Sequence, residues 1–314
     1  MAIKNLKLSF LIAAHNEEKV IEQTLKNLSS LPYNNYEVII GLDACTDNTE
    51  NIVNKFKRLK PPIFKYYKLN LRQGKTSVIN NIIKHAEGDI IIINDADWIF
   101  SYTDKEKLTK FLSVFNNPKI GGIAEHFPVE WDAKKLKNSN LGFKMVAYSS
   151  YYWFKYQKHR FSYQKDNLIY LKEPTMSLTN IFRRKLYKEN LTLGDDFERT
   201  AHIMQKAYDV VLFDNIEMPR MIAVYDKIKI KDLIKQKIRN AIARRQISEV
   251  IKAPINTKSY YLPAILFMLR KSFRDRISAF FIVLFWIFIT TYAVAIAKFT
   301  RKSTSEGWRM RARS

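Results

Sequence analysis

Cysteine is almost absent from this sequence, and histidine is scarce. Cys45 is the only cysteine among 314 residues, so no intramolecular disulfide can form, which fits a reducing compartment. The five histidines are scattered, and none follows another at the H-x-x-x-H spacing of a zinc site. Apolar residues, in contrast, make up 47% of the chain, which excludes a disordered protein. The length is enough for one large α/β domain with an appendage.

Glycine is missing from the one loop that looks like a phosphate-binding P-loop. The stretch "RQGKTS" (72–77) has the glycine–lysine–threonine order of that loop, but the motif also needs a glycine five positions before Gly74. Position 69 is leucine, and residues 70–73 contain no glycine. The loop therefore lacks the backbone flexibility that cradles phosphates, and the sequence excludes a P-loop nucleotide hydrolase.

Acidic residues are too few to balance the basic ones, and the net charge is +23. Such a charge gives information about binding partners rather than about the fold. Nucleic acid, anionic lipid and phosphorylated substrates are all compatible with it. Residues 227–276 carry 14 basic and 3 acidic side chains, so this block alone contributes +11. A nucleic-acid-binding protein stays one alternative at this point, with basic and aromatic residues expected to interleave on an exposed face.

No charge at all occurs in the 21 residues "ISAFFIVLFWIFITTYAVAIA" (277–297). A helix of this length spans about 30 Å, the thickness of the bilayer core. The sequence therefore predicts a transmembrane helix at 277–298, and a buried core helix is the alternative. Arg276 and Lys298 flank it on both sides, so the positive-inside rule leaves the orientation of the tail open.

The first half of the chain alternates between two kinds of pattern. Apolar stretches predict strands at 7–13, 36–42, 63–69 and 89–94, and amphipathic stretches predict helices at 17–28, 47–56 and 75–86. Repeated βα units indicate a mostly parallel sheet covered by helices on both faces. We therefore predict an α/β fold with a Rossmann-like, mostly parallel central sheet. No regular pattern is predicted for the aromatic-rich residues 100–175, which we interpret as core or lid, with acceptor binding as the alternative.

Polar side chains follow three of the predicted strands where each strand ends. Residues 15–17 follow the first strand, Asp43 the second, and Asp95 and Asp97 the fourth. In open α/β sheets, ligands bind outside the carboxyl ends of the strands, so these side chains should meet in one crevice. Two carboxylates one residue apart can hold Mg²⁺ or Mn²⁺, which prefer carboxylate oxygens and keep positions free for substrate phosphates.

A second acidic pair begins the helix expected within "TLGDDFERTAHIMQKAYDVVLFD" (192–214). Asp195 and Asp196 follow the turn at Gly194. Acids in the first turn of a helix also serve simply as caps, so capping is the alternative to a catalytic role.

Six stretches carry a resemblance to a known family. They occur in the family's order within residues 10–240: "FLIAAHNEEKVIEQTL", "GLDACTDNT", "RQGKTSVIN", "GDIIIINDADW", "TLGDDFE" and "KQKIRN". On these motifs the sequence resembles a family 2 inverting glycosyltransferase of the GT-A fold. The resemblance implies transfer of a sugar from a nucleotide-diphosphate sugar, UDP-linked in our interpretation, with Mg²⁺ or Mn²⁺ as cofactor.

The resemblance also implies roles for the donor-side residues. Glu17 and Asp43 would hold the nucleoside, with Asp43 at the base, and Lys75 would border the nucleotide site. Asp95 would touch the ribose or the sugar beside the metal, and Asp97 would ligate the metal.

On the catalytic side, the resemblance implies that Asp196 is the general base, as the second acid of the family's Glu-Asp pair. Gln236 and Arg239 match the Q-x-x-R-W motif, whose arginine lies near the diphosphate. The motifs also depart from the family pattern: Asp195 replaces the glutamate, and Asn240 replaces the tryptophan. Stacking of an aromatic side chain on the acceptor at position 240 is therefore in doubt.

The basic block and the apolar segment together predict a membrane-associated acceptor, such as a polyprenyl phosphate or a lipid-linked glycan. We expect a catalytic domain at 1–225, a basic interfacial helical region at 226–276, the span at 277–298 and a basic tail at 299–314. The first 18 residues look like a strand rather than a signal peptide, which predicts a cytoplasmic catalytic domain on a single-pass or monotopic membrane protein. Anionic headgroups are expected partners and nucleic acid is not. An inactive scaffold is a further alternative, although the acids at positions 97 and 196 are both present.

Overall fold

The protein is described by a computed structural model at residues 5–174, 178–251 and 261–299. Two sequence predictions lie partly outside these ranges. Of the basic tail only Phe299 is described, and residues 252–260 of the predicted interfacial region fall between two described segments.

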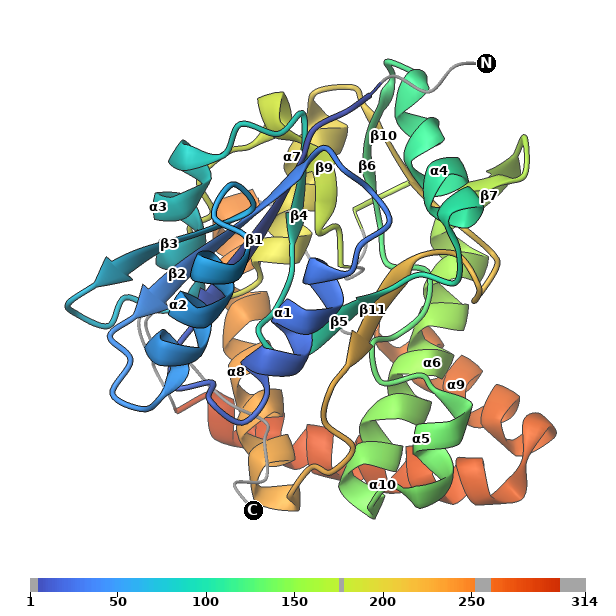
Figure 1. Cartoon of the computed structure of the whole chain (residues 1–314). Helices are drawn as coiled ribbons and strands as arrows, with labels where there is room; N and C mark the ends of the chain where they lie inside the picture. The colour runs from blue at the N-terminus through green and yellow to red at the C-terminus, as the bar shows by residue number, and fades with distance from the viewer. Residues whose placement is uncertain (1–4, 175–177, 252–260, 300–314) are drawn as a thin grey trace.

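A nine-stranded mixed sheet forms the centre of the molecule, in the order β3-β2-β1-β4-β9-β6-β10-β8-β7 (Figure 1). Its strands are β1 (Leu8–Ala14), β2 (Tyr36–Asp43), β3 (Phe64–Leu69), β4 (Ile90–Ile93), β6 (Ile120–Ile123), β7 (Ser162–Lys165), β8 (Leu168–Leu171), β9 (Ile181–Arg183) and β10 (Asp209–Leu212). The first four strands run parallel to one another, and β6 is parallel to β10. The strand β9 and the β7–β8 hairpin are antiparallel to their neighbours. The predicted α/β class with a mostly parallel sheet is confirmed.

Helices connect and cover these strands. They are α1 (Ile21–Ser29), α2 (Thr49–Leu59), α3 (Lys75–Ile82), α4 (Lys105–Ser113), α5 (Ala133–Asn138), α6 (Leu141–Phe161), α7 (Asp195–Gln205), α8 (Ile230–Ile251), α9 (Leu262–Asp275) and α10 (Ile277–Ala297), with single 3₁₀ turns at Ile83–His85, Val114–Asn116 and Arg184–Leu186. A separate two-stranded ribbon pairs β5 (Trp98–Ser101) with β11 (Arg220–Ala223).

The strand sequences explain why the sheet lies between two layers. Successive side chains of a strand point to opposite faces, and in β1 the even-numbered Phe10 and Ile12 join one core cluster while Leu11 joins another. All four residues of the isoleucine run in β4 are buried, as expected for a strand covered on both faces. The polar residues that matter for function therefore collect where these strands end.

The aromatic-rich middle of the chain is more regular than the sequence indicated. A helix of 21 residues, α6, occupies the part of this region for which no regular structure was predicted. Its apolar side chains point in nearly all directions, because it packs against α9 and α10 as well as the main domain, so no amphipathic period appears in the sequence. Tertiary packing thus hides this helix from pattern analysis.

The last three helices pack onto the sheet domain and onto each other. In Figure 1, α9 and α10 lie in the lower part of the view, away from the N-terminus, with α9 beside α6 and α10 crossing the lower parts of α6 and α8. The helix α10 contacts α6, α8 and α9, and its buried side chains Ala279, Val283, Ile289 and Ala293 form the contacting stripe. Most of its remaining surface is exposed and apolar. By length and composition α10 is the one helix of the described residues that could cross a membrane.

Candidate active site

One cavity of about 450 Å³ lies at the carboxyl ends of the central strands. Every site residue predicted from the sequence lines it: Glu17, Asp43, Lys75, Asp95, Asp97, Asp196, Gln236 and Arg239. They come from the ends of β1, β2 and β4 and from the helices α3, α7 and α8. The structure therefore brings together residues that are more than 200 positions apart in the sequence, as the topological argument requires.

The buried carboxylate of Asp43 fixes the loop that precedes α3. Its Oδ1 accepts a hydrogen bond from the Gln73 N–H (2.7 Å), and its Oδ2 accepts one from the Gly74 N–H (2.9 Å). Gly74 has φ 82° and ψ 160°, a conformation that only glycine adopts without strain. The glycine of "RQGKTS" thus serves a tight loop held by Asp43, which places Lys75 at the first position of α3.

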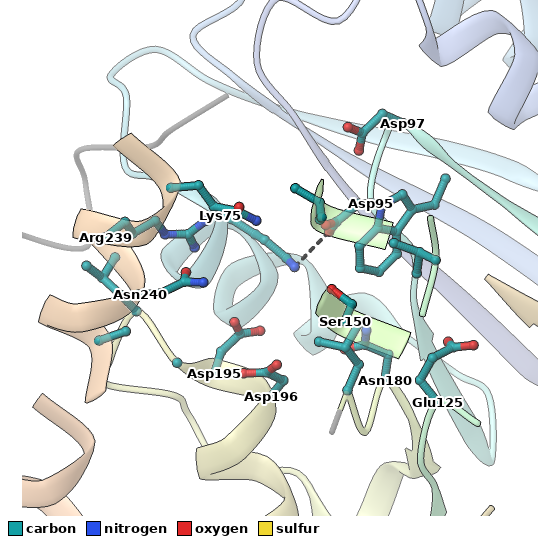
Figure 2. A pocket seen from close by; sticks show the side chains of 18 of the residues that line it. Lys75, Asp95, Asp97, Glu125, Ser150, Asn180, Asp195, Asp196, Arg239 and Asn240 are labelled. Atoms are coloured by element: carbon teal, nitrogen blue, oxygen red, sulfur yellow. Dashed lines mark ion pairs between the residues drawn. The ribbon is translucent and has the colours of Figure 1, made fainter. Parts of the chain in front are cut away.

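Lys75 and Asp95 form an ion pair inside the cavity, with 2.7 Å between Nζ and Oδ1 (Figure 2). The Nζ also lies 5.9 Å from the ring centre of Trp98. Burial alone would lower the pKa of Lys75, but the charges of Asp95 and Asp195 outweigh it and raise that pKa. Asp97 lies on the far side of Asp95 from the lysine (Figure 2). The cation of Lys75 therefore holds one of the two carboxylates at the end of β4, and Asp97 lies outside this pair.

Asp195 and Asp196 begin α7 and differ in their protonation chemistry. Burial opposes the charge of Asp195, but Lys75, Arg199 and Arg239 together lower its pKa, and Arg199 also donates a hydrogen bond to its Oδ2 (2.8 Å). Burial and the neighbouring charge of Asp195 raise the pKa of Asp196 to about 6. A carboxylate with this pKa is ionised at neutral pH and is still basic enough to accept a proton.

The hydrogen bonds of Asp196 test the alternative that this residue only caps helix α7. Its Oδ1 accepts a hydrogen bond from the N–H of Phe197, the next residue, at 2.9 Å. The N-cap position itself belongs to Gly194, which has no side chain to accept a bond. Capping therefore does not account fully for an acid at position 196, because an N-cap side chain bonds the N–H two or three residues on.

The carboxylates suit a divalent cation that is shared with a substrate. Among the described residues, no three side chains of His, Cys, Asp and Glu come together as a metal cluster. Mg²⁺ and Mn²⁺ are commonly held by one or two carboxylates and complete their shell with water and substrate phosphates. Asp95 and Asp97 fit this donor set, and the fit depends on a phosphate ligand in addition to the protein.

The helix α8 contributes more of the cavity wall than the sequence motif indicated. Besides Gln236 and Arg239, it presents Lys237, Asn240 and Arg244 to the cavity. Positions 237, 240 and 244 follow the helical spacing i, i+3, i+7, so this face of a single helix α8 could be found from the sequence. Trp286 of α10 also lines the cavity, and no sequence signal marked it.

The wall opposite Lys75 and Arg239 comes from the segment that follows β6, from α6 and from the residue before β9. Figure 2 shows Glu125, Ser150 and Asn180 on this side, with Asp195 and Asp196 between the two walls. Burial raises the pKa of Glu125 to about 8 against the lowering effect of Arg220. Some residues of the aromatic stretch 148–157 are core and others line the cavity, and acceptor binding by this stretch stays a prediction. The cavity-lining residues of that stretch are Ser149, Ser150, Trp153, Phe154 and Gln157.

Comparisons with known proteins agree with this architecture. The sequence profile of the family described as "Glycosyl transferase family 2" matches residues 9–191. A probable glycosyltransferase, YdaM of Bacillus subtilis, is 29% identical over 227 residues, which cover 66% of this chain and 49% of that protein. The poly-beta-1,6-N-acetyl-D-glucosamine synthase of Staphylococcus epidermidis is 34% identical over 116 residues, or 37% of this chain and 27% of that protein. The chain thus matches about half or less of the length of these curated relatives.

The fold has a solved counterpart. The mannosyltransferase PcManGT of Pyrobaculum calidifontis, solved with GDP-Man and Mn²⁺, superposes with a TM-score of 0.56 at 17% identity. The superposition covers 97% of this chain and 79% of that one. The family profile spans more than half of the chain, and the fold and the motif order agree with it. The chain therefore belongs to glycosyl transferase family 2.

Proposed function

We propose that the protein is an inverting glycosyltransferase that moves a sugar from a nucleotide-diphosphate sugar to a membrane-associated acceptor. The observation that carries this proposal is the meeting of two acidic pairs in one cavity. Asp95 and Asp97 end a buried strand, and Asp196, whose pKa is raised to about 6, faces the same space. One pair suits a diphosphate with its cation, and the other suits proton removal from an acceptor.

On the donor side, Glu17 and Asp43 would hold the nucleoside, and the loop fixed by Asp43 would form its floor. Lys75 would exchange its partner Asp95 for a phosphate oxygen, which frees Asp95 for the sugar or the ribose. Arg239 of α8 lies close enough to Asp195 and Lys75 to influence the pKa of both, and it would bind the diphosphate from the other side. We propose uridine as the base, with guanosine, the base of the donor bound to PcManGT, as the alternative.

Asp97, with Asp95 beside it, would hold Mg²⁺ or Mn²⁺ on the donor diphosphate. When bound, this cation supplies positive charge that stabilises the departing diphosphate. The acceptor oxygen attacks the anomeric carbon from the face opposite the leaving group, so the configuration inverts. The new carbon–oxygen bond forms as the bond to the diphosphate breaks, and Asp196 takes the proton of an acceptor hydroxyl. An acceptor phosphate is already ionised, and Asp196 would then position it rather than deprotonate it.

The C-terminal helices support a membrane-borne acceptor, either a polyprenyl phosphate or a lipid-linked glycan. On α10 the exposed residues Phe281, Leu284, Phe285, Phe288 and Tyr292 fall at helical spacing on one face. On α9, Leu262, Leu266 and Phe273 are exposed as well. An exposed apolar surface of this extent is typical of a protein or membrane interface. The basic residues around it would lie on anionic headgroups, and each near the surface contributes about 1 kcal/mol.

The proposal includes a single-pass or monotopic protein with its catalytic domain in the cytoplasm. Fractionation of cells that express the full chain tests the membrane part. A protein that stays in the supernatant without detergent contradicts it.

A titration of the purified chain with nucleotides tests the donor part. We expect uridine diphosphate to raise the melting temperature in the presence of Mn²⁺ and to have little effect without it. Guanosine and adenosine diphosphates serve as matched ligands. Release of nucleoside diphosphate from a nucleotide sugar, with membrane lipid extract as acceptor source, then tests the reaction. Absence of Mn²⁺-dependent binding by every nucleoside diphosphate contradicts the proposed function.

A further inference from the structure

A cluster of hydrogen-bond donors occupies the corner of the cavity between α8 and α10. Lys237 places its Nζ 4.6 Å from the ring centre of Trp286, and the guanidinium of Arg244 lies 4.8 Å from the ring centre of Tyr261. Lys237, Arg244 and Trp286 all line the cavity that contains Asp196. Positions 237 and 244 are two turns apart on α8, so their side chains share one face of the helix. We name Lys237, Arg244 and Trp286 the α8–α10 corner.

The two cations of the α8–α10 corner lack an ion-pair partner in the described part of the chain. Neither Lys237 nor Arg244 takes part in an ion pair among residues 5–174, 178–251 and 261–299. The Nε of Arg244 and the indole Nε1 of Trp286 are buried and have no hydrogen-bond partner there. Both groups can only donate. A buried cation and buried donors without acceptors are costly, and native proteins normally satisfy them.

The electrostatics of the corner separate it from the donor side of the cavity. Burial and the charge of Arg244 lower the pKa of Lys237 to about 7, and Glu130 opposes them. Lys75 and Arg239, in contrast, act on Asp95, Asp195 and each other. Glu130 is itself buried, and burial raises its pKa. Two neighbouring cations that repel one another, with a single buried carboxyl nearby, match an anionic ligand.

We propose that the α8–α10 corner binds the phosphate group of a lipid-borne acceptor. Phosphate accepts several hydrogen bonds and carries charge that matches the two cations. The lipid is inferred from the other surface of the same helix: Trp286 of α10 lines the cavity, whereas Phe285 and Phe288 beside it are exposed and apolar. A phosphate held here has Asp196 across the cavity and its hydrocarbon chain along α10. The inference rests on the proposed function and names the acceptor group that this function requires.

Charge-removing variants test the corner in the full-length chain in detergent. Lys237→Met and Arg244→Gln each remove one cation, and Lys235→Met is the matched control, because Lys235 lies on the same helix, is exposed and does not line the cavity. Trp286→Phe removes the indole N–H with its five-membered ring and keeps one aromatic ring. The probes are a short-chain prenyl phosphate, the corresponding prenyl alcohol and inorganic phosphate, titrated calorimetrically in the presence of uridine diphosphate and Mn²⁺.

We expect prenyl phosphate to bind wild type more tightly than inorganic phosphate, and the alcohol to bind weakest. Lys237→Met and Arg244→Gln should each weaken prenyl phosphate binding by about tenfold or more, as for loss of a charge-assisted hydrogen bond. Lys235→Met should leave it unchanged, and Trp286→Phe should weaken it less than the charge removals do. Affinity for uridine diphosphate with Mn²⁺ should change by less than about twofold in all four variants.

Three results would overturn the inference: equal binding of prenyl phosphate and inorganic phosphate to wild type, equal binding of prenyl phosphate and the alcohol, or retention of prenyl phosphate binding in both charge variants. A parallel loss of nucleotide binding also overturns it, because the corner then belongs to the donor site. Failure of wild type to bind any nucleoside diphosphate is a different result and counts against the proposed function. A melting curve is recorded with each titration to show that the variant is folded. If a charge variant is unfolded, Trp286→Phe and the three titrations of wild type still test whether the corner binds the lipid phosphate.

Discussion

Two walls of the same cavity carry strong charge, and they differ in whether that charge is already neutralised. On the first wall, at the end of β4 and the start of α7, Lys75 pairs with Asp95 and Arg199 pairs with Asp195, both at 2.7–2.8 Å. On α8, Lys237 and Arg244 have no such partner among the described residues. A paired wall must exchange partners when a ligand binds, whereas an unpaired wall gains its first counter-charge from the ligand. The comparison predicts that changes at the first wall affect folding and donor binding, and that changes at Lys237 and Arg244 affect acceptor binding alone.

Between the two walls, Asp196→Asn should have the largest effect, provided that the attacking group of the acceptor is a hydroxyl. Asparagine keeps the size and the hydrogen bond to Phe197 N–H, so stability should fall by less than about 1 kcal/mol. General base catalysis contributes about 10²–10⁴-fold, and transfer to a hydroxyl acceptor should slow by that factor. Single-turnover release of nucleoside diphosphate beside a melting curve measures both. Near wild-type transfer by the variant would show that no base is needed, as expected for a phosphate acceptor.

The pH profile of the same assay tests the protonation state. The pKa of Asp196 is raised to about 6, so the base is protonated below that value and ionised above it. Transfer to a hydroxyl acceptor should therefore fall about tenfold for each pH unit below about 6 and level off above it. In Asp196→Asn this limb should disappear. A wild-type profile that stays flat down to pH 4.5 contradicts the assignment.

On the paired wall, Arg199→Met should cause the largest loss of stability. The side chains of Arg199 and Asp195 are 2% and 10% exposed, and breaking a buried pair by removing one partner costs about 3–5 kcal/mol. Urea unfolding at pH 7 measures the change, with the exposed Arg58→Met as control. The pKa of Asp195 is lowered in the fold, so its contribution is present at neutral pH and is lost as pH falls through that lowered pKa. The deficit of Arg199→Met should therefore shrink on acidification, and a loss below about 1 kcal/mol contradicts this account.

At the end of β4, Asp97→Ala should affect ligand binding more than folding. Asp97 lies outside the Lys75–Asp95 pair, so its removal leaves that pair intact (Figure 2). Affinity for uridine diphosphate in the presence of Mn²⁺ should fall by about tenfold or more. Mutation of residues that only hydrogen-bond a metal ligand already lowers metal affinity or activity by about 10–100-fold, and loss of a ligand itself should cost at least as much. Calorimetry with and without Mn²⁺ separates the metal-dependent part, and the exposed Glu106→Ala is the control. Unchanged Mn²⁺-dependent affinity would remove Asp97 from the metal site.

The two walls also differ in how well the sequence predicted them. The strand-end wall was predictable, because buried strands are continuous apolar runs and their ends are marked by acids such as Asp43 and Asp97. The eight predicted site residues all line the cavity, while their chemical roles stay predictions. The second wall was not predictable in this way. It depends on how α6, α8 and α10 pack together, and periodicity within one segment contains no information on which helices meet.

Position 240 is a single-residue example of this limit of sequence analysis. The asparagine there departs from the family motif, which left stacking on the acceptor in doubt, and the structure places Asn240 in the cavity wall. Aromatic rings reach the cavity from other elements, among them Trp153 and Phe154 of α6 and Trp286 of α10, which the motif does not include. The difference from the family motif therefore identified position 240 as changed. It could not identify the aromatic residues that line the cavity from other elements.

Removal of an exposed ion pair should have the smallest effect on stability. It separates the contribution of ion pairing to stability from the contribution of burial. Lys68 and Glu50 lie 2.8 Å apart, as close as the partners in the cavity, but their side chains are 53% and 33% exposed. Water and salt screen such a pair, so Lys68→Met should leave the urea midpoint unchanged within error and nucleotide affinity unaltered. A double-mutant cycle with Glu50→Gln isolates the pair itself. A coupling as large as the stability loss in Arg199→Met would mean that pairing, rather than burial, gives the strand-end wall its stability.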